Sequence, residues 1–364
     1  MSPRSQKTKP DYYLIGLVLL LTVFGVIMVG NSSVVEAYRD FGDKLYYFKL
    51  QLQWAGIGLV AFGLTSWLDY HWLKKLSAPL IAGTLFFLVL VLIPQLGTQA
   101  LGARRWLGLG PIRFQPAELA KLALVVYLAA FLSRPSQSEG WPCLVLLVSL
   151  LGLVMLQPDL GTTIVLAATA GTIYFVAGAP WWQIFLLLLA GVGGGAGLIL
   201  TSSYRRERLL TFLNPTRDPL GASYHIRQVL IALGSGGIFG VGLGQSRQKY
   251  EYLPEVSTDS IFAVIAEETV LVGGLLILLL FLLLVWRGLK IAQNTPDGFG
   301  RLLAVGITSW LGIQAFVNLA AMVALVPLTG IPLPFISYGG SSLLLALFAT
   351  GVLVNLSRHQ VAKR

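Results

Sequence analysis

The chain has 364 residues, of which 55% are hydrophobic and only 12% are charged. Apolar runs of about 17 residues or more recur along most of its length, which excludes a soluble globular protein and indicates a polytopic membrane protein. The net charge of +10 does not predict nucleic-acid binding, because no recognition helix and no basic-aromatic strand pattern accompanies it. Anionic lipid headgroups or a diphosphate substrate are the expected partners.

The apolar runs predict an all-α membrane protein of about ten transmembrane helices. The first run follows a short basic tail, as in a secretion signal, but it is longer than a signal core and is expected to stay as a membrane anchor. The predicted ranges are 12–30, 47–67, 77–94, 116–132, 142–157, 161–178, 181–201, 260–286, 300–323 and 339–357.

The basic residues favour an orientation with both termini in the cytoplasm. Lysine and arginine are divided almost equally between the two sides, but many of the opposing charges lie in one long loop, 202–259, and long loops translocate largely regardless of charge. The orientation is therefore set by the short loops with Lys74–Lys75, Arg134 and Arg287–Lys290, which are expected in the cytoplasm. The loop between the seventh and eighth helices is then expected to be extracytoplasmic. The predicted organisation is a cytoplasmic tail at 1–11, one membrane domain at 12–357 and a cytoplasmic tail at 358–364.

Gly-rich and Pro-rich interruptions gather on the predicted outer side. Within the long loop, residues 225–244 are mildly apolar but too short and too broken to span, so a re-entrant or interfacial segment is expected. The small residues Gly191–Gly197 predict close packing of the seventh helix against a neighbour. The interruptions themselves are 101–116, 157–161, 202–259 and 327–342.

The most informative stretch is 249–268, which brings acidic groups to the membrane boundary. Glu251, Glu255 and Asp259 recur every four residues and then run into an apolar segment, whereas Glu267–Glu268 lie two turns deeper, roughly 12 Å further along a helix. An ionised group at that depth costs several kcal/mol unless it is paired or hydrated. The stretch therefore predicts a functional site.

Asp259 is the candidate catalytic acid. It follows Ser257-Thr258, which can cap the next helix, so its carboxylate is expected in the first turn near the positive end of the helix dipole. A helix acid with no further role is the alternative. Crowded carboxylates raise one another's pKa, which can prepare one of them as a general base or create a divalent-cation site with Glu251, Glu255 and Glu267.

Two further acids lie at predicted helix starts. Glu118 and Lys121 are three residues apart on one helical face just after Pro116, so a buried structural ion pair is expected, although Lys121 could also reach a substrate phosphate. Asp159 follows Pro158 at another helix start. It either caps that helix or supports the acidic site.

Arginines crowd the predicted outer side, and arginine is well suited to bidentate phosphate contacts. Any single one could contact a lipid headgroup, whereas together they would suit a lipid diphosphate. The outer arginines are Arg104, Arg105, Arg113, Arg205, Arg206, Arg208, Arg217 and Arg227. The predicted diphosphate-binding residues are Arg104, Arg105, Lys121, Arg205, Arg227 and Lys249.

Other familiar site chemistries find no support. His71, His225 and His359 are expected to lie far apart, so a histidine metal site is not predicted. No Ser-His-Asp arrangement or phosphate-binding loop of the Walker type stands in a suitable context. The single Cys143 allows no intrachain disulfide.

Four blocks of sequence, in the same order and covering nearly the whole chain, resemble the SEDS family of shape, elongation, division and sporulation proteins, bacterial peptidoglycan polymerases exemplified by FtsW and RodA. The blocks are Arg104–Lys121, Gln157–Thr162, Tyr252–Asp259 with Ile261–Glu268, and Pro332–Ser342. The resemblance implies a ten-helix SEDS fold in the bacterial cytoplasmic membrane. It also implies a glycosyltransferase that polymerises lipid II at the outer face, partnered by a class B penicillin-binding protein and by other division or elongation proteins.

By the same resemblance, Asp259 is the family's essential acid. It would take the proton from the sugar 4-hydroxyl that attacks the anomeric carbon of a second lipid II and expels undecaprenyl diphosphate. Glu251 matches a family acid. Arginines or a divalent cation such as Mg²⁺ or Mn²⁺ would neutralise the leaving diphosphate.

The sequence departs from the usual family motif at two places. That motif has a histidine before Thr-Asp and a phenylalanine after it, where this chain has Ser257 and Ser260. The segment Gln245–Pro254 looks more like FtsW, whereas Thr329–Pro334 looks more like RodA, so a division protein is favoured. Two other functions stay open: a lipid II flippase, and a non-catalytic scaffold for the penicillin-binding protein.

Overall fold

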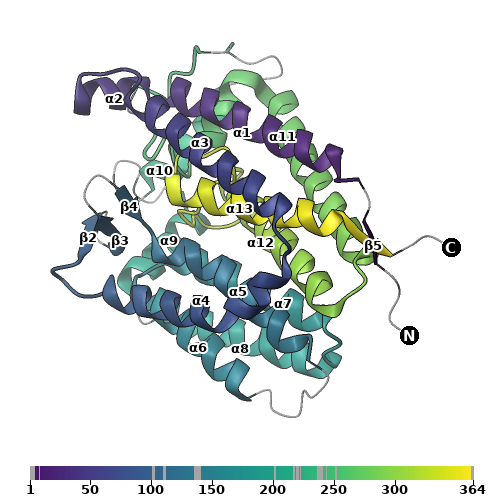
Figure 1. Cartoon of the computed structure of the whole chain (residues 1–364). Helices are drawn as coiled ribbons and strands as arrows, with labels where there is room; N and C mark the ends of the chain where they lie inside the picture. Colours follow the sequence, from purple (N-terminus) through teal and green to yellow (C-terminus); the bar gives the residue numbers. More distant parts are fainter. Residues whose placement is uncertain are drawn as a thin grey trace.

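The computed structural model describes most of the chain as a helical bundle (Figure 1). The described residues are 5–7, 9–100, 103–109, 112–134, 141–200, 202–215, 218, 221, 223–235, 241–242, 244–250 and 252–361. The helices are α1 (Tyr12–Ser32), α2 (Val34–Phe41), α3 (Tyr46–Trp67), α4 (His71–Leu90), α5 (Pro116–Leu132), α6 (Trp141–Leu156), α7 (Leu160–Val176), α8 (Trp181–Leu200), α9 (Ser203–Leu213), α10 (Tyr224–Ser235), α11 (Ile261–Asn294), α12 (Gly298–Met322) and α13 (Gly340–Ser357).

Each predicted transmembrane range has a counterpart: α1, α3 to α8 and α11 to α13. Several of these helices are long and apolar enough to cross a membrane, which makes the chain a multi-pass membrane protein. The segments that meet this criterion by length and composition are Tyr12–Ser32, His71–Leu90, Val272–Asn294, Gly298–Met322 and Gly340–Ser357. Shorter apolar helices cover Pro142–Leu156, Leu160–Val176 and Trp181–Gly197.

Two predicted helix boundaries are wrong by six residues or more. Helix α4 begins at His71 rather than at residue 77, and α11 continues to Asn294 rather than ending at 286. Both differences involve polar ends, because a prediction from apolar runs stops where lysine and arginine appear. A helix continues past such residues when their charged ends can reach water.

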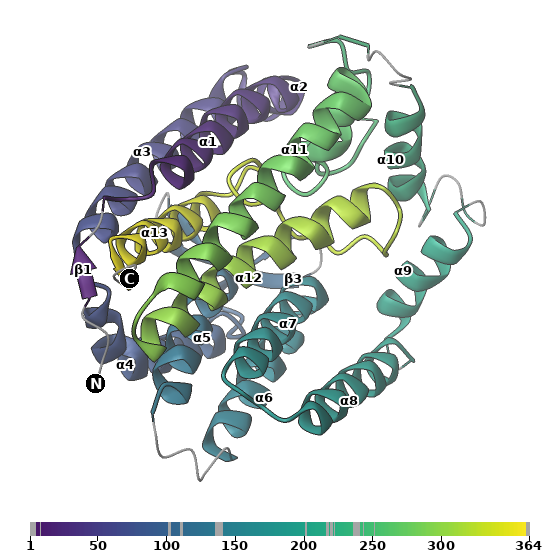
Figure 2. The ribbon, with the colours of Figure 1, turned by 90° about the vertical axis from the view of Figure 1, so that its right-hand side faces the viewer.

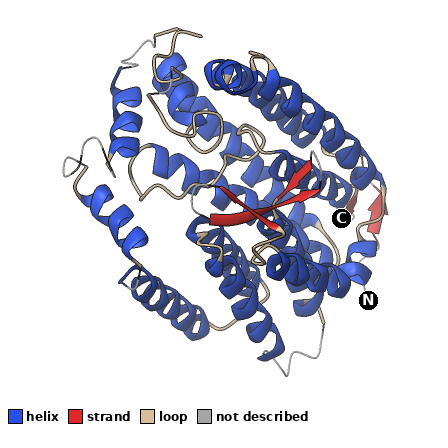
Figure 3. Cartoon of the chain, turned by 90° about the vertical axis from the view of Figure 1, so that its left-hand side faces the viewer, coloured by secondary structure: helices blue, strands red, loops and turns tan. Residues whose placement is uncertain are grey.

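The prediction of an all-α chain missed two small sheets. Strands β2 (Gly97–Ala100), β3 (Ala103–Leu109) and β4 (Ile112–Phe114) form an antiparallel sheet with a bulge between Thr98 and Gln99, in the segment expected to be a loop. Figure 3 shows this sheet lying across one end of the bundle. At the other end, β1 (Ser5–Lys7) pairs with β5 (His359–Val361), which ties the two tails together.

The centre of the bundle is formed by α5, α12 and α13, which are buried along most of their lengths. Helices α8 and α9 lie at one side, and α10 lies beside the start of α11 (Figure 2). The predicted close packing at Gly191–Gly197 is not found within the described part of the chain. A Cβ atom added at Gly191, Gly193, Gly194, Gly195 or Gly197 would meet nothing within 4 Å.

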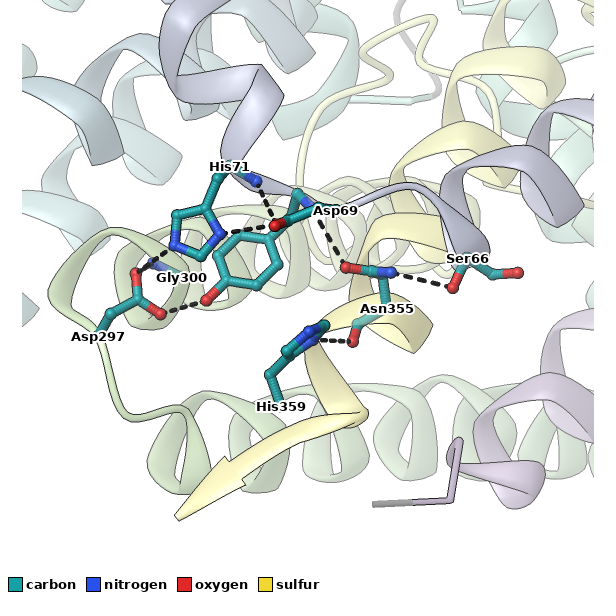
Figure 4. A network of polar contacts seen from close by, with 8 residues as sticks. Ser66, Asp69, His71, Asp297, Gly300, Asn355 and His359 are labelled. Atoms are coloured by element: carbon teal, nitrogen blue, oxygen red, sulfur yellow. Dashed lines mark hydrogen bonds and ion pairs between the residues drawn. The ribbon is translucent and has the colours of Figure 1, made fainter. Parts of the chain in front are cut away.

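The end of the bundle that holds both termini is joined by polar contacts (Figure 4). The Tyr70 hydroxyl donates to Asp297, and His71 Nδ1 lies 2.6 Å from Asp69 Oδ1. His359 also packs against Tyr70, with ring centroids 5.5 Å apart, so the expectation that His71 and His359 lie far apart is wrong. We call this the terminal end and the opposite end the distal end.

One close approach fixes the distal end. A Cβ atom at Gly25 of α1 would lie 2.2 Å from the carbonyl oxygen of Phe335, so only glycine lets the loop between α12 and α13 pass there. Phe335 itself has a positive φ of 65°. This loop runs beside the residues before α11, which carry the candidate site.

Candidate active site

A cavity of about 220 Å³ lies at the distal end around Asp259. Its walls come from α9, α10, the segment before α11 and the loop after α12, which the sequence places far apart. The lining residues are Glu207, Arg208, Thr211, Phe212, His225, Ile226, Asp259 and Leu328. The cavity combines two carboxyl groups, a guanidinium and an imidazole with apolar side chains, and small-molecule sites likewise place a few polar groups in an apolar lining.

Asp259 is positioned through its backbone carbonyl, and its side chain lines the cavity. Asn318 Nδ2 of α12 donates to the Asp259 carbonyl oxygen at 2.9 Å and to the Ile331 carbonyl oxygen at 2.7 Å. The Thr258 hydroxyl lies 3.2 Å from Asp259 Oδ1. Helix α11 begins at Ile261, and its N-cap Ser260 makes no side-chain cap. Asp259 therefore lies two residues before the helix, and the expectation that it stands inside the first turn is wrong.

Burial dominates the electrostatics of Asp259. Burial first, and then the nearby Glu255 carboxylate, raise the pKa of this carboxyl to about 7, against smaller lowering effects that include the Thr258 hydroxyl and Arg208. A carboxyl group with a pKa near 7 is ionised in a large fraction of molecules at neutral pH and still holds an abstracted proton well. This is the balance that a general base requires.

His225 and Arg208 are the residues that sequence reasoning did not bring to the site. His225 Nε2 lies 2.7 Å from the Ser260 hydroxyl, and burial together with Arg208 lowers the pKa of the imidazole to about 4, so it is neutral at pH 7. Arg208 donates to the Leu328 carbonyl oxygen at 3.0 Å. Arg208 was one of many outer arginines in the sequence, and only the packing of α9 against the loop after α12 singles it out.

The other predicted acids divide into different environments. Glu255 is exposed beside Asp259, with a positive φ of 51°, and its Oε2 lies 2.7 Å from the Thr258 hydroxyl. Glu267 is buried and accepts hydrogen bonds from Ser246 and from two backbone amides of the loop before residue 250. Glu251 lies outside the described residues. Within the described ranges, no three acidic, histidine or cysteine side chains converge to hold a metal ion.

Lys249, a predicted diphosphate ligand, lies in a separate buried cluster. Its Nζ is 3.6 Å from Glu268 Oε1 and 3.2 Å from Asn31 Oδ1, and Asn31 Nδ2 in turn donates to Glu268 Oε2 at 2.6 Å. The cluster ties the segment before residue 250 to α1 and α11. Lys249 does not line the cavity of Asp259.

The predicted arginines also spread over several positions. Arg105 donates to the carbonyl oxygens of Gln157, at 3.0 Å, and Pro158, which joins the small sheet to the turn before α7. Arg205 reaches the Met155 carbonyl oxygen at 3.5 Å. Arg104 on β3 and Arg227 on α10 are partly exposed and do not line the cavity.

The predicted pair of Glu118 and Lys121 is present. Lys121 Nζ lies 2.7 Å from Glu118 Oε1 and 2.7 Å from Gln314 Oε1, and both charged side chains are almost fully buried. Gln314 Nε2 donates to the Pro332 carbonyl oxygen at 2.9 Å. The pair therefore supports the loop after α12 from within the bundle, which is the structural role that the spacing predicted.

Asp159 caps α7. Its carboxylate accepts hydrogen bonds from the Thr162 amide and the Thr162 hydroxyl, both at 3.0 Å. It is buried and does not line the cavity of Asp259. Of the two roles open from the sequence, the structure gives it helix capping.

Comparison with known proteins identifies the family. A sequence profile of the FTSW_RODA_SPOVE family, described as cell cycle protein, matches residues 11–362, and the chain belongs to this family. The chain is 46% identical to stage V sporulation protein E of Bacillus subtilis (strain 168), over 98% of this chain and 99% of the relative. It is 41% identical to a probable peptidoglycan glycosyltransferase FtsW of Geobacter sp. (strain M18), over 95% and 96%.

Solved structures agree with this assignment. A chain from a study of how a peptidoglycan synthase complex coordinates polymerization and crosslinking superposes with a TM-score of 0.78 at 33% identity, covering 96% of this chain and 98% of that one. The crystal structure of the rod shape determining protein RodA of Thermus thermophilus superposes with a TM-score of 0.69 at 31% identity, covering 96% and 97%. The resemblance seen in the four sequence blocks is thereby confirmed.

Proposed function

We propose that this family member is a peptidoglycan glycosyltransferase that polymerises the lipid-linked disaccharide lipid II, with Asp259 as its general base. Relatives that cover nearly the whole chain carry the name of this activity. The observation that supports the role of Asp259 is its position: a buried carboxyl with a pKa of about 7, facing a cavity that also contains Arg208. We place both termini in the cytoplasm and the distal end at the outer face of the membrane.

In the proposed reaction, the 4-hydroxyl oxygen of one sugar attacks the anomeric carbon of another. The bond between that carbon and the diphosphate oxygen breaks, and the diphosphate leaves with the bonding electrons. The hydroxyl proton passes to the ionised Asp259 carboxylate, a transfer that typically accelerates a reaction by roughly 10²–10⁴-fold. The positive charge of Arg208 in the same cavity is placed to stabilise the departing diphosphate.

The neutral state of His225 has a consequence for this mechanism. A cationic imidazole next to Asp259 would lower the carboxyl pKa and weaken the base, whereas the neutral ring bonded to Ser260 leaves the raised pKa intact. Ser260, which replaces the phenylalanine of the usual family motif, supplies the hydroxyl of this contact.

A divalent cation such as Mg²⁺ or Mn²⁺ would supply further charge for the leaving diphosphate. Asp259 and Glu207 are the described carboxylates that line the cavity, with the exposed Glu255 beside Asp259, and among the described residues these groups do not make a closed metal site. These carboxylates would hold such a cation together with oxygens of the substrate, and the cation would supply positive charge for the leaving diphosphate.

The experiment compares wild type with Asp259→Asn, using purified protein, lipid II and Mg²⁺, with and without a class B penicillin-binding protein as the proposed partner. Asp159→Asn is the matched control, because it changes a buried aspartate outside the cavity. Long glycan chains from wild type and from the control, and none from Asp259→Asn, are expected. Equal products from Asp259→Asn would reject it as the base. No product from any form with the partner bound would favour a flippase or a scaffold.

A further inference from the structure

Four aromatic rings touch one another at the distal end, next to the segment of Asp259. The rings of Phe41 and Tyr46 stack with centroids 3.8 Å apart, and Tyr47 contacts both of them edge-on. Tyr47 also meets Tyr338 with centroids 4.9 Å apart. We call Phe41, Tyr46, Tyr47 and Tyr338 the aromatic platform. Phe41 is 50% exposed, so the platform is open to a ligand on its α2 side.

The platform is fixed to the residues before Asp259. The Tyr338 amide donates to the Ser257 carbonyl oxygen at 2.8 Å, and Ser257 is two residues, at most about 7 Å of chain, from Asp259. Gln51 of α3 donates to the Ser337 carbonyl oxygen at 3.2 Å, which locks the turn that carries Tyr338. Because these rings are held before any ligand arrives, binding to them costs little ordering entropy.

Polar groups border the platform. Glu36 of α2 accepts a hydrogen bond from the Ser257 hydroxyl at 3.4 Å. The pKa of Glu36 is raised, mainly by its partial burial and secondly by the negative charge of Glu255. Arg113 on β4 is exposed and close enough to Tyr338 to lower the pKa of that hydroxyl, although burial raises it to about 12 overall. The border therefore offers carboxylate acceptors on one side and a guanidinium donor on the other.

We propose that the aromatic platform is a subsite for the glycan strand, binding lipid-free sugar units of the growing polymer next to Asp259. A pyranose ring presents an apolar face of C–H groups that packs on an aromatic ring, and its hydroxyl and acetamido groups need hydrogen-bond partners at the edge. The platform and its border supply both. The identity of the sugar, though not the chemistry of the surface, rests on the proposed polymerase function.

The position of the platform favours a sugar over a lipid tail or a protein. The cavity lined by Arg208 lies on the α9 and α10 side of Asp259, whereas the platform lies on the α2 and α3 side. Asp259 thus lies between a cavity whose Arg208 guanidinium can contact a diphosphate and a charge-bordered aromatic surface. That order matches a reaction between one sugar still bearing diphosphate and another belonging to a strand. A hydrocarbon tail would not use the carboxylates of Glu36 and Glu255.

The test measures binding of a lipid-free tetrasaccharide of alternating N-acetylglucosamine and N-acetylmuramic acid to the full-length protein in nanodiscs. Tyr46→Leu and Phe41→Leu are each expected to raise the Kd about two- to tenfold. Tyr46→Phe keeps the ring and is expected to bind like wild type, which also shows that the position tolerates change. Tyr12→Leu, an exposed tyrosine at the terminal end, is the matched control and is expected to have no effect.

Chain length provides a second readout, because a weaker hold on the strand should shorten the glycans made by Tyr46→Leu while Asp259 stays intact. The inference is overturned if wild type does not bind the tetrasaccharide, or if wild type and both leucine variants bind it equally well. If the leucine variants no longer bind the penicillin-binding partner but bind the tetrasaccharide as wild type does, the inference is also overturned, and the platform is a protein-docking surface. A wild type that polymerises but does not bind the tetrasaccharide refutes the subsite alone, whereas absent polymerisation refutes the proposed function.

Discussion

The pH dependence of polymerisation tests the role of Asp259 most directly. A base with a pKa of about 7 is ionised in about one tenth of molecules at pH 6 and about nine tenths at pH 8, so the rate should rise with pH through about 7. Glu255→Gln removes the neighbouring charge that helps to raise this pKa. The carboxylates lie at most about 6 Å apart, because the Thr258 hydroxyl contacts Glu255 Oε2 at 2.7 Å and Asp259 Oδ1 at 3.2 Å.

At that separation, two unit charges in a solvent-exposed setting repel by about 1 kcal/mol. Removing the repulsion should therefore move the midpoint of the pH profile down by about 0.5–1 pH unit. The assay follows initial rates of lipid II polymerisation from pH 5.5 to 8.5. Asp43→Asn, which changes a partly exposed acid between α2 and α3, is the control and should leave the midpoint in place. A midpoint that is unchanged or higher in Glu255→Gln would refute Asp259 as the titrating base.

Three further predictions concern stability. Because the pKa of Asp259 is raised, the stability associated with its neutral form is lost as pH rises toward 7, so Asp259→Asn should melt at a higher temperature than wild type at pH 8 and show little difference at pH 4. Lys121→Met should destabilise the protein by about 3–5 kcal/mol, because it strands the buried Glu118 carboxylate, and adding Glu118→Leu should restore most of the loss in thermal unfolding. Gly25→Ala should reduce both stability and polymerisation, because its Cβ would lie 2.2 Å from a backbone carbonyl, whereas Gly16→Ala has open space and should be neutral in the same two assays.

The ten long apolar helices could be predicted from hydrophobicity alone, because each membrane-crossing helix must present an unbroken apolar run. The errors arose where that signal ends. The basic residues that extend α11 to Asn294 and the polar start of α4 carry no apolar signal, yet the backbone continues to form its own hydrogen bonds there. The strands within 97–114 contain glycines and arginines in place of regular alternation, so the sequence carries no period-two signal for their pairing.

Only part of the candidate site could be predicted from the sequence. Asp259 was found because a carboxylate at the edge of an apolar run is costly, which is a local signal. His225 and Arg208 carry no such signal. They reach the cavity because α9 and α10 fold back over the segment before α11, and a long loop does not reveal this from its composition. The same limit hid the buried contacts of Lys249, whose partners Asn31 and Glu268 come from α1 and α11.

Helix α12 explains why a reactive carboxyl can stand on a loop and still be precise. Gln314 and Asn318 are one turn apart, both buried, and their amides bind the backbone carbonyls of Pro332, Ile331 and Asp259. Each bond satisfies a loop carbonyl that would otherwise be stranded away from water, so its loss leaves both partners unpaired. Lys121 fixes Gln314 in turn, at 2.7 Å. The loop of Asp259 is therefore positioned from the interior of the membrane bundle, and the ion pair recognised at Glu118 and Lys121 acts on the site only through α12.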